Sequence, residues 1–552
     1  MKVLLLYPNR VLVTRMQLGL AYLSTYLKKA GHEIDLFDTT FLKCGDFKSD
    51  EEHRENSLQV INPDLLKYGL YERDANVYDE FQDAVDTFNP DIIATSIVDP
   101  NYNFSLSLLR HIKKYRSEII TVAGGPTPTY APEEVIAEDC VDYICVGEGE
   151  EPIVELVNNL KNNVDVTNIP NIWCKPNGEI KKNAIRNALD VSELLYPDWD
   201  IFDDRHIWRP MAGKMYRLGM FAMSRGCTFK CAYCSNSVLV QLYKDKGTFY
   251  RIKKPDAFIK ELKHYKEKYN LNFIFFTDDL FPLHQISLVR EEDTSSMLEE
   301  FVALYKEHIN LPFSVNLYPE LIKEDSFKKL VEAGLANICV GLESGSNEIR
   351  VNILKRKYKN EQVVKVFNWA KKYNVRSSSF NMIGLPHETR SKILETMLLN
   401  YDARPTTNTV TYFHPYRGET LRDLCIKEGL FNPDDETDFE DQYREGSLLT
   451  LPQISQQELN GLFKTFSLYA KLPKSLHWLI KYAEGESWGS NFVYQKLKKV
   501  WSKLTINDMI WDFTNHLEEN TMNGNTTTTG FDETIPNVKL GSDAVDVSSP
   551  LN

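Results

Sequence analysis

Three cysteines lie within eight positions of this chain, in the segment RGCTFKCAYCSNS. Cys227, Cys231 and Cys234 have the spacing C-x3-C-x2-C. A zinc site would normally add a fourth Cys or His at short spacing, and none follows here. In a four-iron cluster, three thiolates leave one iron free to bind the amino and carboxylate groups of a ligand. The spacing therefore favours a [4Fe–4S] cluster over zinc and over three structural thiols.

Six strand-like segments between residues 216 and 430 each precede a helical pattern, which predicts a partial (β/α)6 TIM-type barrel. In such barrels the functional residues gather in the loops after the strands. Cys227 follows the first strand directly. The next five strands end at Asp278–Asp279, at Asn316, at Glu343–Ser344, at Gly384 and at Tyr416–Arg417. These polar endings predict a site at one end of the barrel. Arg356 either belongs to that site or is a solvated charge at a helix end.

Residues 1–165 alternate apolar strands with helical patterns, which predicts a doubly wound, Rossmann-like (flavodoxin-like) α/β domain. Such domains bind ligands at the carboxyl ends of their strands. The candidate motifs at these strand ends are Ser96-Ile97-Val98 at the third strand, Gly124-Gly125 at the fourth and Gly147 after the fifth. A polar insertion at about residues 40–77 interrupts the pattern, and its role does not follow from its sequence.

The remaining segments are less regular. Residues 166–215 read as a connector, in which an Asn-Gly pair at 177–178 predicts a hairpin turn. Residues 216–430 form the predicted barrel, and residues 431–518 predict a mostly helical region. Residues 519–552 are rich in Thr, Asn, Ser and Gly, which predicts a disordered tail.

Composition limits the class of protein. The net charge of −14 argues against a nucleic-acid-binding surface. The chain has no apolar run of about 18 residues and no signal-peptide pattern, so we expect no membrane span. Nine cysteines in 552 residues, three of them clustered, do not suggest a disulfide framework. A reducing, cytoplasmic location is expected.

The cysteine spacing, with Tyr233 just before the last cysteine, resembles the radical S-adenosylmethionine (SAM) superfamily. An α/β domain before such a barrel resembles its cobalamin (B12)-binding subfamily. The segments LGLAYLSTYLKKAGHEIDLFD, Ser96-Ile97-Val98 and GGPTPTYAPEEVI carry that second resemblance. Together the two resemblances cover about residues 1–430.

The resemblance implies that the three cysteines hold a [4Fe–4S] cluster with SAM at its open iron. It implies SAM contacts at Tyr233, Asp278, Asp279, Asn316, Glu343, Ser344, Gly384 and Tyr416, and cobalamin contacts at Ser96, Val98, Gly124, Gly125 and Gly147. The first strand–helix loop, PNRVLVTRMQLG, lacks the histidine that ligates cobalt in many cobalamin domains. Either cobalamin binds without a protein histidine, or the domain has lost the cofactor.

The implied reaction is anaerobic methylation of an unactivated carbon in a small-molecule, natural-product or lipid-like substrate. It would use a 5′-deoxyadenosyl radical and methylcobalamin, with an electron donor such as flavodoxin or ferredoxin. Three alternatives remain at this stage: a cobalamin-dependent cyclisation, rearrangement or oxidation; a tRNA methylthiotransferase; and a zinc-binding scaffold.

Overall fold

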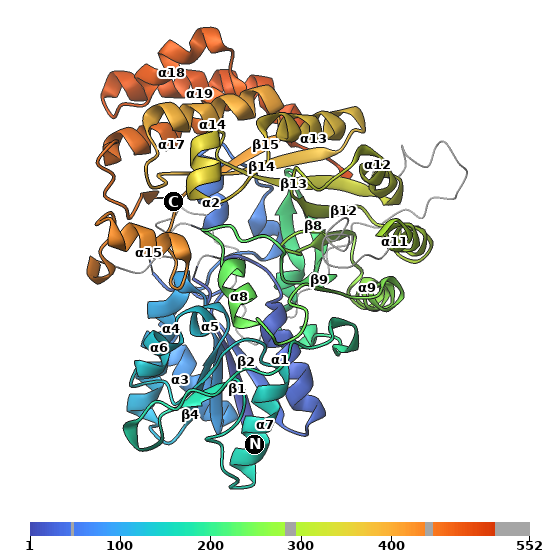
Figure 1. The fold of residues 1–552 in the computed structure, drawn as a ribbon, viewed down its shortest axis with the longest axis vertical. Coiled ribbons are helices and arrows are strands. Elements are labelled where there is room, and N and C mark those ends of the chain that lie inside the picture. The colour runs from blue at the N-terminus through green and yellow to red at the C-terminus, as the bar shows by residue number, and fades with distance from the viewer. Residues whose placement is uncertain (11, 46–48, 282–293, 436–444, 514–552) are drawn as a thin grey trace, which may run out of the picture.

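The computed structural model describes residues 1–10, 12–45, 49–281, 294–435 and 445–513. It contains two large sheets, one from the N-terminal third of the chain and one from the middle (Figure 1). Helix α8 (Asn236–Leu242), just after the cysteines, lies between them. The predicted tail at 519–552 lies outside the described residues. Among the described helices, none is long and apolar enough to cross a membrane.

The first sheet has the strand order β2-β1-β3-β4-β5-β6 and is parallel except for β6. Its strands are β1 (Lys2–Tyr7), β2 (Glu33–Asp38), β3 (Ile92–Ser96), β4 (Ile120–Gly124), β5 (Tyr143–Cys145) and β6 (Ile172–Cys174). The helices around it are α1 (Leu18–Lys29), α3 (Val77–Phe88), α4 (Tyr102–Tyr115), α5 (Pro126–Tyr130), α6 (Pro132–Ala137) and α7 (Glu150–Lys161). The doubly wound α/β prediction is confirmed. Strand β2 lies at the edge of the sheet, and only Phe37 among its residues is buried.

The second sheet has the order β15-β14-β13-β12-β11-β8-β7, and its first six strands are parallel. The parallel strands are β8 (Lys214–Phe221), β11 (Phe273–Phe276), β12 (Phe313–Leu317), β13 (Leu335–Glu343), β14 (Arg376–Ile383) and β15 (Thr407–Tyr412). The helices that accompany them are α9 (Pro255–Tyr269), α11 (Thr294–His308), α12 (Glu324–Ala333), α13 (Asn360–Lys372), α14 (Arg390–Ala403) and α15 (Thr420–Lys427). The predicted partial barrel is confirmed.

The connector joins the two sheets by adding a strand to each. Its first part supplies β6. The backbone of Cys174 then forms an isolated antiparallel β-bridge with Lys181, across the predicted Asn-Gly turn. Its last part supplies β7 (Trp208–Met211), which pairs antiparallel with β8. Between these strands Trp199 is buried against the rings of Phe221 and Tyr265. The connector is therefore part of the packed core.

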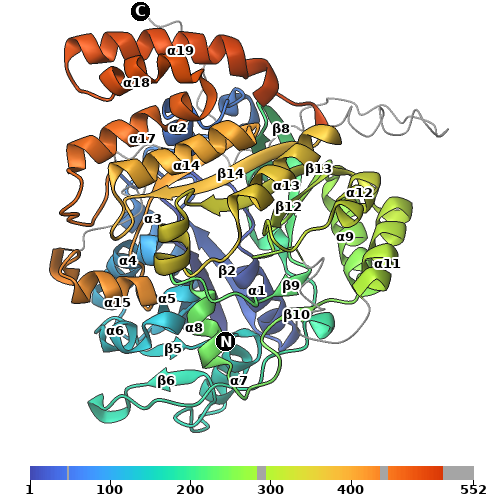
Figure 2. The same ribbon diagram turned by 45° about the horizontal axis from the view of Figure 1, so that its top comes forward.

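The insertion covers an edge of the second sheet. Its helix α2 (Asp50–Asn56) lies among the barrel elements in both ribbon views, apart from the rest of the N-terminal domain (Figures 1 and 2). The buried side-chain amide of Gln59 donates to the Val410 carbonyl (3.2 Å) and accepts from the Val410 N–H (3.3 Å). Val410 lies in β15, which is an edge strand of this sheet. The Gln59 amide therefore provides hydrogen-bond partners for backbone groups that a neighbouring strand would otherwise pair.

The predicted helical region contains α17 (Gln456–Lys471), α18 (His477–Ala483) and α19 (Trp488–Met509). Helix α17 packs against α14 and β15, as Figure 2 shows. Arg390 of α14 forms a two-pronged ion pair with Glu484, with both N–O distances at 2.7 Å. This region thus supports the flank of the barrel.

Candidate active site

The three cysteines occupy the loop between β9 (Ser224–Arg225) and α8, directly after β8. Gly226 begins the loop with φ of 90°, and a Cβ there would lie 2.8 Å from the Phe249 carbonyl oxygen, so glycine is required. All three thiols are free, Cys231 is buried, and the other two are partly exposed. Burial raises the pKa of Cys227 to about 12 and that of Cys234 to about 11.

Thiols with raised pKa values ionise only when a cation compensates the charge. Among the described residues, no three His, Cys, Asp or Glu side chains converge as they would around a single metal ion. A [4Fe–4S] cluster takes one thiolate on each of three separate irons. Three cysteines on one loop, with no fourth ligand at short spacing, fit that group.

The two predicted aspartates have different environments. Asp278 is buried and accepts hydrogen bonds from the backbone N–H groups of Ser224 (2.6 Å) and Met223 (3.2 Å). It therefore fixes the backbone just before the cysteine loop, and burial raises its pKa to about 6. Asp279 instead accepts from the side-chain amide of Asn236 (2.9 Å). Asn316 donates to the backbone carbonyl of Asp278 (2.9 Å) and so supports the same turn.

Asn236 is a site residue that the sequence reasoning missed. Its amide nitrogen lies 3.7 Å from the Cys234 sulfur as well as within hydrogen-bond distance of Asp279. Its carbonyl oxygen is buried and has no hydrogen-bond partner among the described residues. Its position two residues after the last cysteine was the available signal. Asn236 links the cysteine loop to the end of β11 and offers a free acceptor.

A second connected group contains Glu343, Arg356 and Tyr233. The Arg356 guanidinium donates to the Glu343 carboxylate (3.2 Å), to the Tyr233 hydroxyl (2.5 Å) and to the Gly341 carbonyl (2.9 Å). Burial raises the pKa of Glu343, and the charge of Arg356 opposes that rise. Arg356 is only 6% exposed, so its interpretation as a solvated charge is wrong.

The other predicted SAM residues have protein partners of their own. The Ser344 hydroxyl is fully buried and lies 3.5 Å from the Thr396 hydroxyl. Gly384 has φ of 77°, and its N–H donates to the buried carboxylate of Glu388 (2.8 Å). The Tyr416 ring is stacked on the His414 ring, with 6.2 Å between centroids. These three residues follow the ends of β13, β14 and β15, as predicted.

The predicted cobalamin residues lie at neighbouring strand ends of the first sheet. Ser96 accepts a hydrogen bond from the Gln17 side chain (3.1 Å), and a Cβ on Gly125 would lie 2.7 Å from the Ser96 hydroxyl. Gly125 has φ of 92°, so it is required for both space and conformation. Gly124 has room for a Cβ at ordinary contact distance. The Val98 N–H donates to the Asn101 side chain (3.0 Å).

The carboxyl ends of the two sheets face each other. Arg225, next to the cysteine loop, pairs with Glu148 (2.8 Å) and Glu150 (2.5 Å) of the first domain. Gly147 has φ of 85°, and a Cβ there would lie 2.7 Å from the Tyr243 hydroxyl, just beyond α8. Thus a predicted cobalamin residue contacts the segment that follows the cysteines.

A second bridge lies at the other side of this interface. Arg417, after β15, pairs with Asp99 (2.5 Å), just after Val98, and its guanidinium lies over the Tyr102 ring. Both charged side chains of the pair are buried. The two predicted cofactor edges are therefore held against each other by charge pairs at both sides.

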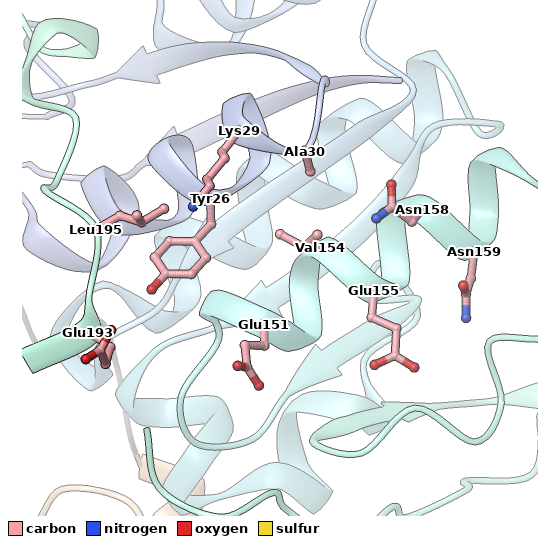
Figure 3. A pocket seen from close by; sticks show the side chains of 10 residues that line it. All are labelled: Tyr26, Lys29, Ala30, Glu151, Val154, Glu155, Asn158, Asn159, Glu193 and Leu195. Atoms are coloured by element: carbon pink, nitrogen blue, oxygen red, sulfur yellow. The ribbon is translucent and has the colours of Figure 1, made fainter. Parts of the chain in front are cut away.

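A hollow of about 600 Å³ lies elsewhere, on the outside of the first domain (Figure 3). Tyr26 and Lys29 of α1 line it from one side, and Glu151 and Glu155 of α7 from the other. It contains none of the predicted site residues, so its size alone does not make it the active site.

Comparison with known proteins identifies both domains. Residues 221–399 match the model of the radical SAM superfamily, and residues 14–157 match the B12 binding domain. An uncharacterized methyltransferase of Pyrococcus horikoshii is 24% identical over 440 residues, which are 78% of this chain and 84% of that protein. The anaerobic magnesium-protoporphyrin IX monomethyl ester cyclase of Rubrivivax gelatinosus is 22% identical over 363 residues, 64% of this chain and 62% of that protein.

The fold also matches a solved structure. The radical S-adenosylmethionine methyltransferase TsrM from Kitasatospora setae, solved with cobalamin and a [4Fe–4S] cluster bound, superposes with a TM-score of 0.62 at 14% identity. The match covers 90% of this chain and 99% of that one. The domain order, the three-cysteine loop and the facing strand ends agree with these findings. The chain is a cobalamin-dependent radical SAM enzyme, a member of the family that uses a [4Fe–4S] cluster, SAM and cobalamin.

Proposed function

We propose that this enzyme is a methyltransferase that adds a methyl group to an unactivated carbon of a small molecule. The contact between Gly147 and Tyr243 carries the proposal, because it brings the predicted cobalamin edge against the segment after the cysteines. A substrate between the two edges would have a cofactor on each side. The methyltransferase name of the Pyrococcus relative supports the same reaction class.

When bound, the cluster and SAM supply hydrogen abstraction from carbon, and cobalamin supplies the methyl group. The protein's contribution is to bind and orient these groups and to exclude water. Cys227, Cys231 and Cys234 would hold the cluster. The Asp279 carboxylate and the free Asn236 oxygen would accept hydrogen bonds from the SAM ammonium group.

Other residues would position these ligands. Asp278 fixes the backbone that leads into the cysteine loop, and Arg356 holds Glu343 and Tyr233 in place. Asn316, Ser344, Gly384 and Tyr416, at neighbouring strand ends, complete the proposed SAM surface.

In the first domain, Ser96, Val98, Gly124, Gly125 and Gly147 would follow the cobalamin tail. The segment PNRVLVTRMQLG supplies no histidine, so cobalamin would bind without a protein imidazole below the cobalt.

The proposed reaction needs electrons. We infer a small electron-transfer protein such as flavodoxin or ferredoxin as the donor, because the cluster must be reduced before SAM is cleaved. All nine cysteines are free thiols, which suits a reducing, cytoplasmic setting.

Anaerobic reconstitution with iron, sulfide and hydroxocobalamin tests both metal centres in one sample, by absorbance and EPR. Cys227→Ala should lose the cluster signal and SAM cleavage but keep cobalamin, because Cys227 lies outside the first domain. Cys44→Ala, which changes a partly exposed thiol elsewhere, is the matched control and should keep both. Zinc without iron or sulfide in anaerobically purified protein would refute the proposal.

A second candidate is a cobalamin-dependent reaction that transfers no methyl group, favoured by the similarity to the Rubrivivax cyclase. The two candidates differ in their products. Methylation yields S-adenosylhomocysteine together with 5′-deoxyadenosine, whereas a cyclisation without methyl transfer yields no S-adenosylhomocysteine. Quantifying both nucleosides in turnover with a processed substrate separates them.

A further inference from the structure

A cavity of about 310 Å³ lies inside the half-barrel, at the end opposite to the cysteine loop. Its wall contains alternate residues from the first halves of three adjacent strands. These are Asn337 and Cys339 of β13, Arg376, Ser378 and Phe380 of β14, and Thr407 and Thr409 of β15. Side chains two apart on a strand share a face, so these residues point into the barrel together. We call this cavity the floor cavity.

The floor cavity is closed by segments from outside the barrel. The insertion contributes Asp50, Glu51, Arg54 and residues 60–62; the connector contributes residues 209–212; and α19 contributes Met509. The insertion already covers the free edge of β15 through Gln59. It therefore closes the side of the barrel that the seven strands leave open.

Arg376 is a charged group on the barrel wall of this cavity, and β7 adds Arg209, which donates to the Thr14 carbonyl. Arg376 is only 6% exposed, and its guanidinium donates to Asn337 (3.0 Å), to Ser378 (3.1 Å) and to Thr407 (3.4 Å), all neutral side chains. Its Nε has no hydrogen-bond partner, and no carboxylate lies within ion-pair distance of it in the described part of the chain. Burial lowers the pKa of Arg376 to about 10, and the neighbouring charge of Arg54 adds to that effect.

Buried charges in proteins are normally paired, because leaving one unpaired costs several kcal/mol. The two carboxylates that line the cavity do not serve this purpose. Glu51 and Asp50 lie 3.2 and 3.9 Å from the Arg54 guanidinium, on their own helix. An anion that enters the cavity would supply the negative charge that Arg376 lacks as a partner.

Part of the cavity wall is apolar. Leu218, Met220 and Phe275 line it, together with Phe380. Phe380 is 37% exposed although it lies in the middle of β14, so there is open space beside its ring. From Arg376 to Ile383 at the end of β14 the strand rises by about 23 Å, at about 3.3 Å per residue. A ligand that spans this distance is elongated.

We propose that Arg376 binds the anionic group of the enzyme's substrate, a carboxylate or a phosphate, at the floor of the half-barrel. The apolar part of the substrate then packs against Phe275 and extends along Phe380 toward the cysteine loop. The substrate class is an elongated amphipathic acid. The identification of this ligand as the substrate rests on the proposed function, whereas the anion site itself does not.

Calorimetric titration of the reconstituted full-length enzyme tests the proposal with three probes of one chain length: octanoate, octyl phosphate and 1-octanol. At least one anion should bind saturably, and 1-octanol should bind at least about tenfold more weakly, since a charged hydrogen bond contributes about 1.5–3 kcal/mol. The better anion identifies the head group. Equal binding of all three probes, or no saturable binding of either anion, overturns the proposal.

Arg376→Gln should weaken anion binding by about tenfold or more and leave 1-octanol unchanged. Arg217→Gln is the matched control, because Arg217 is a partly buried arginine of β8 that donates to the Tyr269 carbonyl on the other face of the sheet. Unchanged anion binding in Arg376→Gln overturns the proposal.

Phe380→Trp keeps the test decisive even if Arg376→Gln does not fold. The larger ring would fill the open space and should reduce the binding of all three probes, with Arg376 intact. Unchanged binding in this variant places the anion elsewhere and overturns the proposal. None of these titrations requires turnover. Enzyme that holds iron and cleaves SAM but binds no anion refutes only this inference, whereas anion binding through Arg376 without a cluster refutes only the proposed function.

Discussion

Arg356 and Arg376 are both buried in the half-barrel, 6% exposed each, but at opposite ends of its strands. At the carboxyl end, Arg356 contacts Glu343, Tyr233 and a backbone carbonyl. At the floor, Arg376 contacts only neutral side chains among the described residues. The two ends therefore differ in charge pairing: Arg356 has a carboxylate partner, whereas Arg376 has none among the described residues.

The largest effect is expected for Arg356→Gln. This change leaves the buried Glu343 carboxylate without its charge partner, so the free energy of unfolding should fall by about 3–5 kcal/mol. Urea unfolding followed by circular dichroism measures the loss.

The double variant Arg356→Gln/Glu343→Gln is the control, and it should recover part of the loss because no charge is left unpaired. A loss below about 1 kcal/mol in the single variant would mean that Glu343 is satisfied by other groups. The contrast between the two ends would then disappear.

The carboxyl end was largely predictable because its residues lie in short contiguous motifs. The cysteine spacing and the polar strand endings predicted that these residues would gather at one end of a partial barrel, and the fold has them at the carboxyl ends of its strands. Sequence could not separate Asp278 from Asp279, since only the fold shows that backbone N–H groups occupy the former. The burial of Arg356 was equally invisible, because its partner Tyr233 lies 123 positions away in the chain.

The floor could not be predicted, because it combines separate segments that are ordinary when read singly. Arg376, Ser378 and Phe380 alternate along β14, but alternation does not say which face lines a cavity. The insertion showed no motif, and its contacts with the barrel, such as that of Gln59 with the edge strand β15, join residues far apart in the chain. Such long-range pairings exist only in the folded molecule.

An intermediate effect, sensitive to pH, is expected for Glu388 at the carboxyl end. Burial raises the pKa of this carboxyl to about 8, although the Leu385 and Gly384 N–H groups oppose the rise. The folded state thus keeps a proton that the unfolded chain loses near pH 4.5. The contribution of Glu388 to the free energy of unfolding is therefore largest at low pH. It is lost as the pH rises toward about 8, by up to about 1.4 kcal/mol per pH unit.

Glu388→Gln removes the titrating group and should flatten this part of the pH dependence. Urea unfolding of both proteins between pH 5 and pH 8.5 measures the difference in slope. The exposed Glu267→Gln serves as the control and should keep the wild-type slope. Parallel slopes in wild type and Glu388→Gln would show that water reaches this carboxyl, so the carboxyl end would be less sealed than its contacts suggest.

The smallest effect on stability is expected at the floor, and it separates the two arginines most directly. Arg376→Gln removes a buried charge and leaves no carboxylate unpaired. The free energy of unfolding should therefore fall by less than about 1 kcal/mol, or should rise. The better-binding anion, octanoate or octyl phosphate, at a hundred times its dissociation constant should stabilise the wild type by about 2.7 kcal/mol and the variant much less. Unfolding with and without that anion measures both quantities. If Arg376→Gln instead loses as much stability as Arg356→Gln, the guanidinium is a structural group like its counterpart, and the floor is as complete as the carboxyl end.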